Sequence, residues 1–152
     1  MNQIAQLLPA TNILLDLDAG SKAGQFDALR ALFEANRGIA RGTVVDSLMA
    51  REKLGSTGLG QGVAIPHGRI KGLREAQGAF VSLKQPIAFD APDGKPVAQV
   101  FVLLVPENAT EQHLQLLSEL AHMFSERSFR TRLAAAGDAA TVNALFRDWT
   151  PA

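Results

Sequence analysis

The chain has 152 residues, of which 47% are hydrophobic, so it can form one core of ordinary size but not two comfortable domains. Fifteen basic and fifteen acidic residues give a formal net charge of zero, and no overall field therefore favours nucleic acid or an anionic membrane surface. The absence of cysteine excludes disulfides, thiolate metal sites and a catalytic thiol. We therefore expect one domain over residues 1–152, with no nucleic-acid partner.

The chain start, MNQIAQLLPATN, lacks the basic flank and long apolar run of a signal peptide. The longest strongly apolar run, residues 100–105, stops at Pro106 and is far too short to cross a bilayer as a helix. These features predict a cytoplasmic protein without membrane insertion.

The first half of the chain predicts one strand and two helices after a short amphipathic start. Residues 13–17 are rich in branched aliphatic side chains, as is typical of a strand. Ser21 is expected to cap a helix that ends at 36–38, because apolar residues follow it at helical spacing. Thr43 is expected to open a second helix that ends at Gly55.

The second half predicts a run of strands followed by helices. Strands are expected at 63–65, 79–83, 87–89 and 97–105, with a turn at 90–94 between the last two. Helices are expected from Thr110 to Phe124, over 129–136, and from Asp138 to Trp149. This alternation predicts an α/β fold, although it does not order the strands.

A glycine-rich segment, GSTGLGQGVAIPHG at Gly55 to Gly68, ends on a histidine between proline and glycine. Its clustered glycines predict positive φ angles or a close approach of the backbone to another group. Pro66 fixes its own φ, and Gly68 leaves one side of His67 uncluttered, so a defined backbone should present the imidazole. A loop shaped only by sterics, with a buried histidine bonded to a carbonyl, remains the alternative.

The same segment does not fit the phosphate-binding loops of nucleotide sites. A dinucleotide fingerprint leaves a strand and enters a helix, whereas this segment follows a predicted helix and enters a predicted strand. The Gly-Lys-Ser/Thr tripeptide of a P-loop occurs nowhere in the chain. The sequence therefore does not predict nucleotide binding.

The other two histidines, His113 and His122, fall on opposite sides of one predicted helix. Their nine-residue step, at about 100° per residue, prevents them from sharing a metal ion. His113 falls on the face of Leu117 and Phe124 and should point inward, whereas His122 should face water. His113 is either a histidine at the edge of the core or a partner of His67 near a helix N-terminus. No metal site is predicted.

Arg51 lies one helical turn before the glycine-rich segment. It is either a solvated cation at a helix C-terminus or a guanidinium that reaches back to bind phosphate oxygens. Ser56 and Thr57 offer hydroxyls to a bound anion, or serve local hydrogen bonding. The neighbouring charged residues with no special placement are expected to be solvated, namely Glu52, Lys53, Lys71, Arg74 and Glu75.

This set of residues suits phosphoryl transfer to histidine. A neutral imidazole, with an ordinary pKa of about 6.5, is nucleophilic near physiological pH. Phosphoryl transfer needs mainly positioning and neutralisation of the oxygens, which arginine, hydroxyls and backbone amides supply. The G-x-S-x-G and H-E-x-x-H patterns of hydrolases are absent.

Three blocks of sequence resemble one family. They are REKLGSTGLGQGVAIPHG at Arg51 to Gly68, PIAFDAPDGKPV at Pro86 to Val97 and LLVPENATEQHLQLL at Leu103 to Leu117. Together they resemble the IIA component of the bacterial phosphoenolpyruvate phosphotransferase system, of the fructose/mannitol type and its nitrogen-regulatory branch. The likeness runs over almost the whole chain.

The resemblance implies a role for each candidate site residue. His67 is the phosphoacceptor, and an HPr-like phosphocarrier of the NPr type is its donor. Arg51 and His113 match the arginine and the second histidine that help to hold the phosphoryl group. Beside these three, we expect Ser56, Thr57 and Gly58 of the glycine-rich segment to bind phosphate, and no cofactor is expected.

The resemblance also implies a fold and a set of partners. The fold is a single mixed β-sheet of about five strands with helices on both faces. In the regulatory branch, phosphorylation state controls targets such as potassium transporters or sensor kinases. A free-standing sugar-specific IIA that passes phosphate to a IIB component, and a binding module in which His67 is only structural, remain alternatives.

Overall fold

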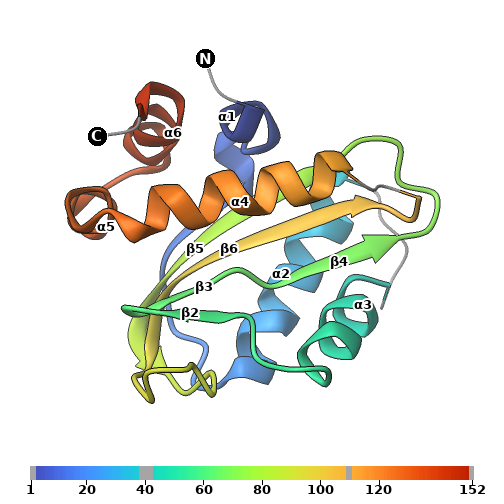
Figure 1. Cartoon of the computed structure of the whole chain (residues 1–152), viewed down its shortest axis with the longest axis horizontal. Helices are drawn as coiled ribbons and strands as arrows, with labels where there is room; N and C mark the ends of the chain where they lie inside the picture. Colours follow the sequence, from blue (N-terminus) through green and yellow to red (C-terminus); the bar gives the residue numbers. More distant parts are fainter. Residues whose placement is uncertain (1–2, 38–42, 109–110, 151–152) are drawn as a thin grey trace.

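The computed structural model describes residues 3–37, 43–108 and 111–150, and omits the side chains of 3, 34–37, 112 and 113 (Figure 1). The helices are α1 Gln3–Leu7, the short 3-10 helix η1 Ala10–Asn12, α2 Lys22–Arg37, α3 Thr43–Glu52, α4 Glu111–Ser125, α5 Arg127–Ala135 and α6 Ala139–Asp148. The strands are β1 Ile13–Leu17, β2 Gly58–Gly60, β3 Val63–Ala64, β4 His67–Ile70, β5 Gln77–Ile87 and β6 Val97–Pro106. No helix of the described residues is long and apolar enough to cross a membrane.

Within the part of the chain that the structure describes, six strands form one mixed sheet in the order β1-β5-β6-β3-β2, with β4 also paired to β6. Strands β5 and β6 run antiparallel, whereas β1 is parallel to β5, and both β3 and β4 are parallel to β6. Strand β6 is therefore bordered on one side by β5 and on the other by β3 and then β4. The predicted mixed sheet is confirmed, with six strands in place of about five.

Helices cover both faces of the sheet and enclose two apolar cores. One core joins α1, α4, α5 and α6 to one face of β6, through Phe101, Leu103 and Val105. The other core joins α2 and α3 to the opposite face, through the alternate residues Val100 and Val102. Because side chains alternate along a strand, an apolar run such as β6 serves both cores at once. The predicted helices on both faces are thus confirmed.

Strand β5 corrects two predictions, because it runs without a break from Gln77 through the expected strand at 79–83 to Ile87, and residues 88 and 89 of the second expected strand lie outside any strand. Pro86 lies inside it and cannot donate a hydrogen bond to the sheet. The pairing of β5 with β6 shifts register between Ser82 and Ile87, and this irregularity accommodates the proline. The predicted turn that follows is present, and Gly94 lies in it with φ of 72°.

At two helix starts the structure shows the side-chain cap that the sequence predicted. Ser21 Oγ accepts the Gly24 N–H at 3.1 Å, and Asp138 Oδ1 accepts the Thr141 N–H at 2.7 Å. These two caps confirm the predicted starts of α2 and α6. The predicted cap at Thr110 lies outside the described residues.

Much of the glycine-rich segment is built into the sheet; the strand expected at 63–65 is present as β3, whereas β2 and the start of β4 were not expected. Strands β2 and β3 pair in antiparallel fashion around Gln61 and Gly62, which have φ of 59° and 80°. Glycine tolerates such angles, and they suit a tight hairpin turn. At Gly58 an added Cβ would lie 2.9 Å from the Ala91 Cβ, so the expected close approach is confirmed there.

Candidate functional site

His67 is the first residue of β4, immediately after a break in the line of strands beside β6. Strand β3 pairs with β6 through Ala64, and β4 resumes pairing at His67 opposite Leu103. Between them, the Ile65 N–H donates to the Thr57 carbonyl at 3.1 Å. This break separates two short strands and leaves the His67 side chain half-buried at the start of the second.

One ring nitrogen of His67 is committed to the backbone. Nδ1 lies 2.9 Å from the Ile65 carbonyl oxygen, and a carbonyl can only accept, so Nδ1 carries the hydrogen. The lone pair of the neutral ring is therefore on Nε2. Burial of the ring lowers its pKa, and the Ile65 carbonyl opposes this shift. The positive charge of Arg51 lowers the pKa further, whereas Glu52 raises it. The net direction is downward, which keeps the imidazole neutral and nucleophilic at neutral pH.

Arg51, in the last turn of α3, contacts the other nitrogen. Its Nε donates to Nε2 of His67 at 3.3 Å, and its Nη1 donates to the Gly55 carbonyl at 2.7 Å. The side chain thus contacts the glycine-rich segment, and its binding of phosphate oxygens stays a prediction. Arg51 and His67 together line two neighbouring hollows, of about 310 and 420 Å³.

A close contact between α3 and β4 brings Arg51 to the ring. Gly68, the residue after His67, packs directly against Ser47 of α3. A Cβ at position 68 would lie 3.1 Å from the Ser47 Cβ and closer still to its hydroxyl oxygen. The Ser47 hydroxyl in turn donates to the Arg69 carbonyl at 3.1 Å. Glycine at position 68 is thus explained by the approach of the helix that carries Arg51.

The predicted phosphate-binding residues Ser56, Thr57 and Gly58 all line the 310 Å³ hollow beside His67. Their polar groups already have partners within the protein. The Ser56 hydroxyl donates to the Phe89 carbonyl and accepts the Gly58 N–H at 3.0 Å. The Thr57 hydroxyl donates to the carboxylate of Glu52. Their part in phosphate binding stays a prediction, and it requires these bonds to be exchanged or supplemented.

Glu52 was expected to be solvated, and that expectation is wrong. Its side chain is only 6% exposed, and its Oε2 lies 3.0 Å from Nζ of Lys22, the first residue of α2. No local pattern marked this pair, because its partners are 30 residues apart and α2 and α3 must pack before they meet. The other four residues of that set are exposed as predicted, namely Lys53, Lys71, Arg74 and Glu75.

Helix α4 supplies one wall of the 310 Å³ hollow through Leu117, Ser118 and Ala121. Phe124 and Leu120 are buried in the core, which confirms the inward face predicted for this helix. His113 lies in α4 four residues before Leu117, but its side chain lies outside what the structure describes. Its pairing with His67 therefore stays a prediction.

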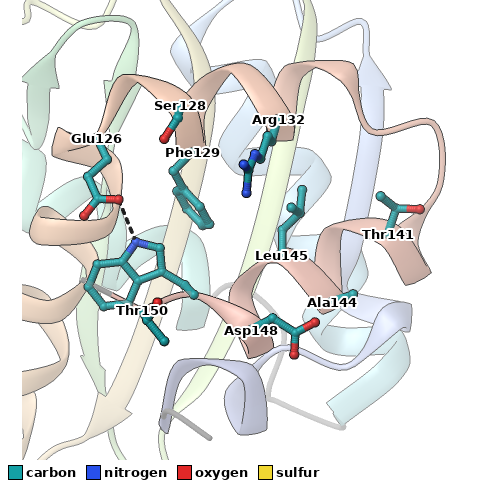
Figure 2. A pocket seen from close by; sticks show the side chains of 10 residues that line it. Glu126, Ser128, Phe129, Arg132, Thr141, Ala144, Leu145, Asp148 and Thr150 are labelled. Atoms are coloured by element: carbon teal, nitrogen blue, oxygen red, sulfur yellow. Dashed lines mark hydrogen bonds between the residues drawn. The ribbon is translucent and has the colours of Figure 1, made fainter. Parts of the chain in front are cut away.

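His122 belongs to a different part of the surface. A larger hollow of about 450 Å³ lies between α5 and α6, at the other end of α4 (Figure 2), and Trp149 is one of the residues that line it. The indole nitrogen of Trp149 donates to Glu126 Oε1 at 3.2 Å. The His122 ring, with its side chain 54% exposed, meets the Trp149 ring edge-on at 5.1 Å between centroids. His122 is thus exposed as predicted, and its ring contact is with Trp149.

Among the residues that the structure describes, no group of three histidine, aspartate or glutamate side chains could hold a metal ion. At His67 the hydrogen bonds of the ring place a neutral imidazole beside a guanidinium. A nucleophilic nitrogen next to a fixed cation suits attack on an anionic group such as a phosphoryl.

Comparison with known proteins also points to phosphoryl transfer. Residues 6–149 match the family described as "Phosphoenolpyruvate-dependent sugar phosphotransferase system, EIIA 2". A nitrogen regulatory protein of Pseudomonas aeruginosa is 40% identical over 154 residues, which cover 97% of this chain and 94% of the relative. The crystal structure of the nitrogen regulatory protein IIA-Ntr from Neisseria meningitidis superposes with a TM-score of 0.90 at 50% identity, over 95% of this chain and 99% of that one.

A sugar-specific relative is also similar. The fructose-specific EIIA component of Haloferax volcanii is 33% identical over 143 residues, which cover 93% of each chain. The similar proteins thus include nitrogen regulatory proteins and a sugar-specific component. The sequence identity is higher to the two nitrogen regulatory proteins above.

Proposed function

Since this chain belongs to the EIIA 2 family of the phosphoenolpyruvate-dependent sugar phosphotransferase system, we propose that it carries a phosphoryl group on Nε2 of His67. The observation that carries the proposal is that the two ring nitrogens of His67 have different hydrogen-bond partners. Nδ1 is held by the Ile65 carbonyl at 2.9 Å, and Nε2 faces Arg51 at 3.3 Å. Only Nε2 has its lone pair available for attack in this tautomer.

The transfer step needs no proton movement on this protein. The donor is an HPr-like phosphocarrier of the NPr type that bears a phosphohistidine. The Nε2 lone pair of His67 forms the new N–P bond while the donor N–P bond breaks, and its electron pair returns to the donor imidazole. The phosphorylated ring keeps its hydrogen on Nδ1, where the Ile65 carbonyl stabilises the positive charge that the ring gains.

Arg51 has two successive partners in this mechanism. In the unphosphorylated protein its Nε donates to Nε2 of His67 over a rather long 3.3 Å, so little is lost when that bond is released. The guanidinium then donates to the equatorial oxygens, which carry most of the charge in a loose transition state. His113 is proposed as a second group that holds the phosphoryl oxygens.

Phosphorylation of His67 serves regulation in this proposal. The two nitrogen regulatory relatives, at 40% and 50% identity, support that branch over the fructose-specific relative at 33%. Targets such as potassium transporters or sensor kinases would then distinguish the phosphorylated from the unphosphorylated surface. The second candidate, transfer onward to a sugar-specific IIB component, is supported by the fructose-specific relative.

The testing experiment is reconstitution with phosphoenolpyruvate, the general phosphotransfer enzyme and an HPr-like carrier. We expect one equivalent of phosphate on wild-type protein and none on His67→Ala. The bond should be acid-labile and base-stable, and nitrogen NMR should place it on Nε2. One equivalent of label on His67→Ala would overturn the assignment, and no label on folded wild-type protein would favour the binding-module alternative. Addition of a sugar-specific IIB would then separate the two carrier roles.

A further inference from the structure

A buried carboxylate beside the site reaches the ring of His67 through the backbone. We propose that Glu52 is a positioning residue that acts through Thr57 and Ile65 to hold His67 in the tautomer that leaves Nε2 reactive. This inference rests on the proposed function of His67 and adds a group that does not touch the phosphoryl itself.

Glu52 has a defined partner for each of its two oxygens. Oε1 accepts the Thr57 N–H at 3.2 Å and also the Thr57 hydroxyl. Oε2 accepts from Lys22 Nζ at 3.0 Å. Lys22 is itself fixed, since it donates to the Phe89 carbonyl at 3.3 Å and lies 4.5 Å from the centre of the Phe89 ring. A carboxylate that is 6% exposed and bonded on both oxygens is a rigid anchor.

Thr57 connects the fixed carboxylate of Glu52 to Ile65 by hydrogen bonds. Thr57 is 5% exposed, and the bonds to Glu52 use both its N–H and its hydroxyl. Its carbonyl oxygen accepts the Ile65 N–H at 3.1 Å, in the break between β3 and β4. The Ile65 carbonyl then accepts from Nδ1 of His67 at 2.9 Å. Four residues thus form an unbroken series of hydrogen bonds from carboxylate to imidazole.

The series complements the direct contact of Arg51. Arg51 and Glu52 are consecutive residues in the last turn of α3, yet they act on opposite sides of one ring. Arg51 contacts Nε2 directly, and Glu52 reaches Nδ1 through Thr57 and Ile65. A single helix end therefore controls both nitrogens, and a hydrogen bond at one nitrogen determines the role of the other.

The test uses Glu52→Gln in the full chain. A glutamine has one acceptor oxygen, whereas the carboxylate uses two, so either Thr57 or Lys22 must lose its partner. Glu75→Gln is the matched control, because it makes the same change at an exposed residue outside the series. Nitrogen–proton NMR of histidine-labelled, unphosphorylated protein reports the tautomer of His67, and the His122 ring serves as an internal reference.

We expect wild type and Glu75→Gln to show a single Nδ1–H tautomer, and Glu52→Gln to show a mixture. Transfer from a phosphorylated carrier should slow by about tenfold or more in Glu52→Gln, as for other groups that orient a functional histidine. Lys22→Met/Glu52→Gln removes the competing partner of the glutamine oxygen, so it should recover much of the tautomer and of the rate. It also keeps the test decisive if Glu52→Gln fails to fold.

An unchanged His67 tautomer in folded Glu52→Gln would overturn the proposal, even if transfer slows, because the carboxylate would then act on stability alone. Failure of the double variant to recover the tautomer would overturn the route through Thr57. The tautomer is measured without phosphate. A failure of His67 to accept phosphate is therefore distinguishable from a failure of this inference.

Discussion

Nε of Arg51 lies 3.3 Å from Nε2 of His67, although the two residues are sixteen positions apart in the chain. A guanidinium is always protonated and can only donate, so this contact requires Nε2 to accept. The contact therefore selects the neutral ring with its lone pair toward the cation. In the proposed transfer, the same cation is in place to meet the phosphoryl oxygens when that lone pair attacks.

Replacement of Arg51 should slow phosphoryl transfer without preventing folding. Arg51→Gln removes the cation, and we expect a loss of about 10²- to 10³-fold in rate, as for removal of one donor that stabilises transition-state charge. Arg51→Lys should recover only part of the rate, because an ammonium lacks the planar fork. Single-turnover transfer from pre-phosphorylated carrier measures this, with Arg74→Lys at an exposed position as control. A wild-type rate in Arg51→Gln would contradict the role.

Acceptance of phosphate by His67 should persist below pH 6.5. Burial, aided by Arg51, lowers the pKa of the ring, so the neutral nucleophile remains populated where an ordinary imidazole of pKa about 6.5 is protonated. An NMR titration should place the His67 midpoint below that value, and Arg51→Gln should raise it. A midpoint at or above 6.5 in wild type would contradict the prediction.

The same shift predicts a dependence of stability on pH. Because the unfolded ring binds a proton more readily than the folded one, protonation favours unfolding. This contribution is absent well above pH 6.5, and it destabilises the fold as the pH falls from 6.5 toward the lower folded pKa. Denaturant unfolding across this range should show a weaker loss of stability in His67→Gln than in wild type.

A side chain at position 68 should disturb the site through α3. Gly68→Ala brings a Cβ to 3.1 Å from the Ser47 Cβ, and such overpacking costs about 1–3 kcal/mol. We expect a lower free energy of unfolding and slower transfer, because α3 must retreat with Arg51. Gly137→Ala is the control, since nothing lies within 4 Å of an added Cβ there. Ser47→Gly combined with Gly68→Ala should recover the transfer rate; continued slow transfer in this pair would contradict the steric explanation.

The two remaining histidines should behave differently. His113→Ala is expected to slow transfer or to destabilise phosphorylated His67, whereas His122→Ala should leave both unchanged. His122 contacts the single tryptophan, Trp149, so its removal should alter tryptophan fluorescence. Thermal midpoints of both variants separate packing from chemistry. Equal transfer rates would leave His113 as an ordinary residue at the edge of the core.

Transfer to His67 should not need a divalent ion. The chain has no cysteine, and the described residues hold no cluster of three metal-binding side chains. Pre-phosphorylated, isolated carrier should therefore donate equally well in excess EDTA. A loss of transfer that added magnesium or zinc restores would point to a metal site.

Local signals in the sequence predicted much of the fold. The caps at Ser21 and Asp138 were correct because a cap depends on residues three positions away. The bounds of the strands were less predictable. Pro86 argues against a continuous strand, but β5 passes through it with a shift of register that its partner β6 permits. In the glycine-rich segment only the strand at 63–65 was predicted; β2 and β4 were missed, because such short strands depend on partners elsewhere in the sheet.

The sequence by itself supplied the candidate chemistry: a histidine between Pro66 and Gly68, an arginine one turn before the glycines, and no thiol. Only the tertiary structure decided which atoms meet. It brought Arg51 to Nε2, buried Glu52 against Lys22 and Thr57, and directed Nδ1 to Ile65. The reason is physical. Caps and periodicity arise within a few residues, whereas the partners of a side chain depend on how closely α3 packs against β4, and that distance is a property of the whole core.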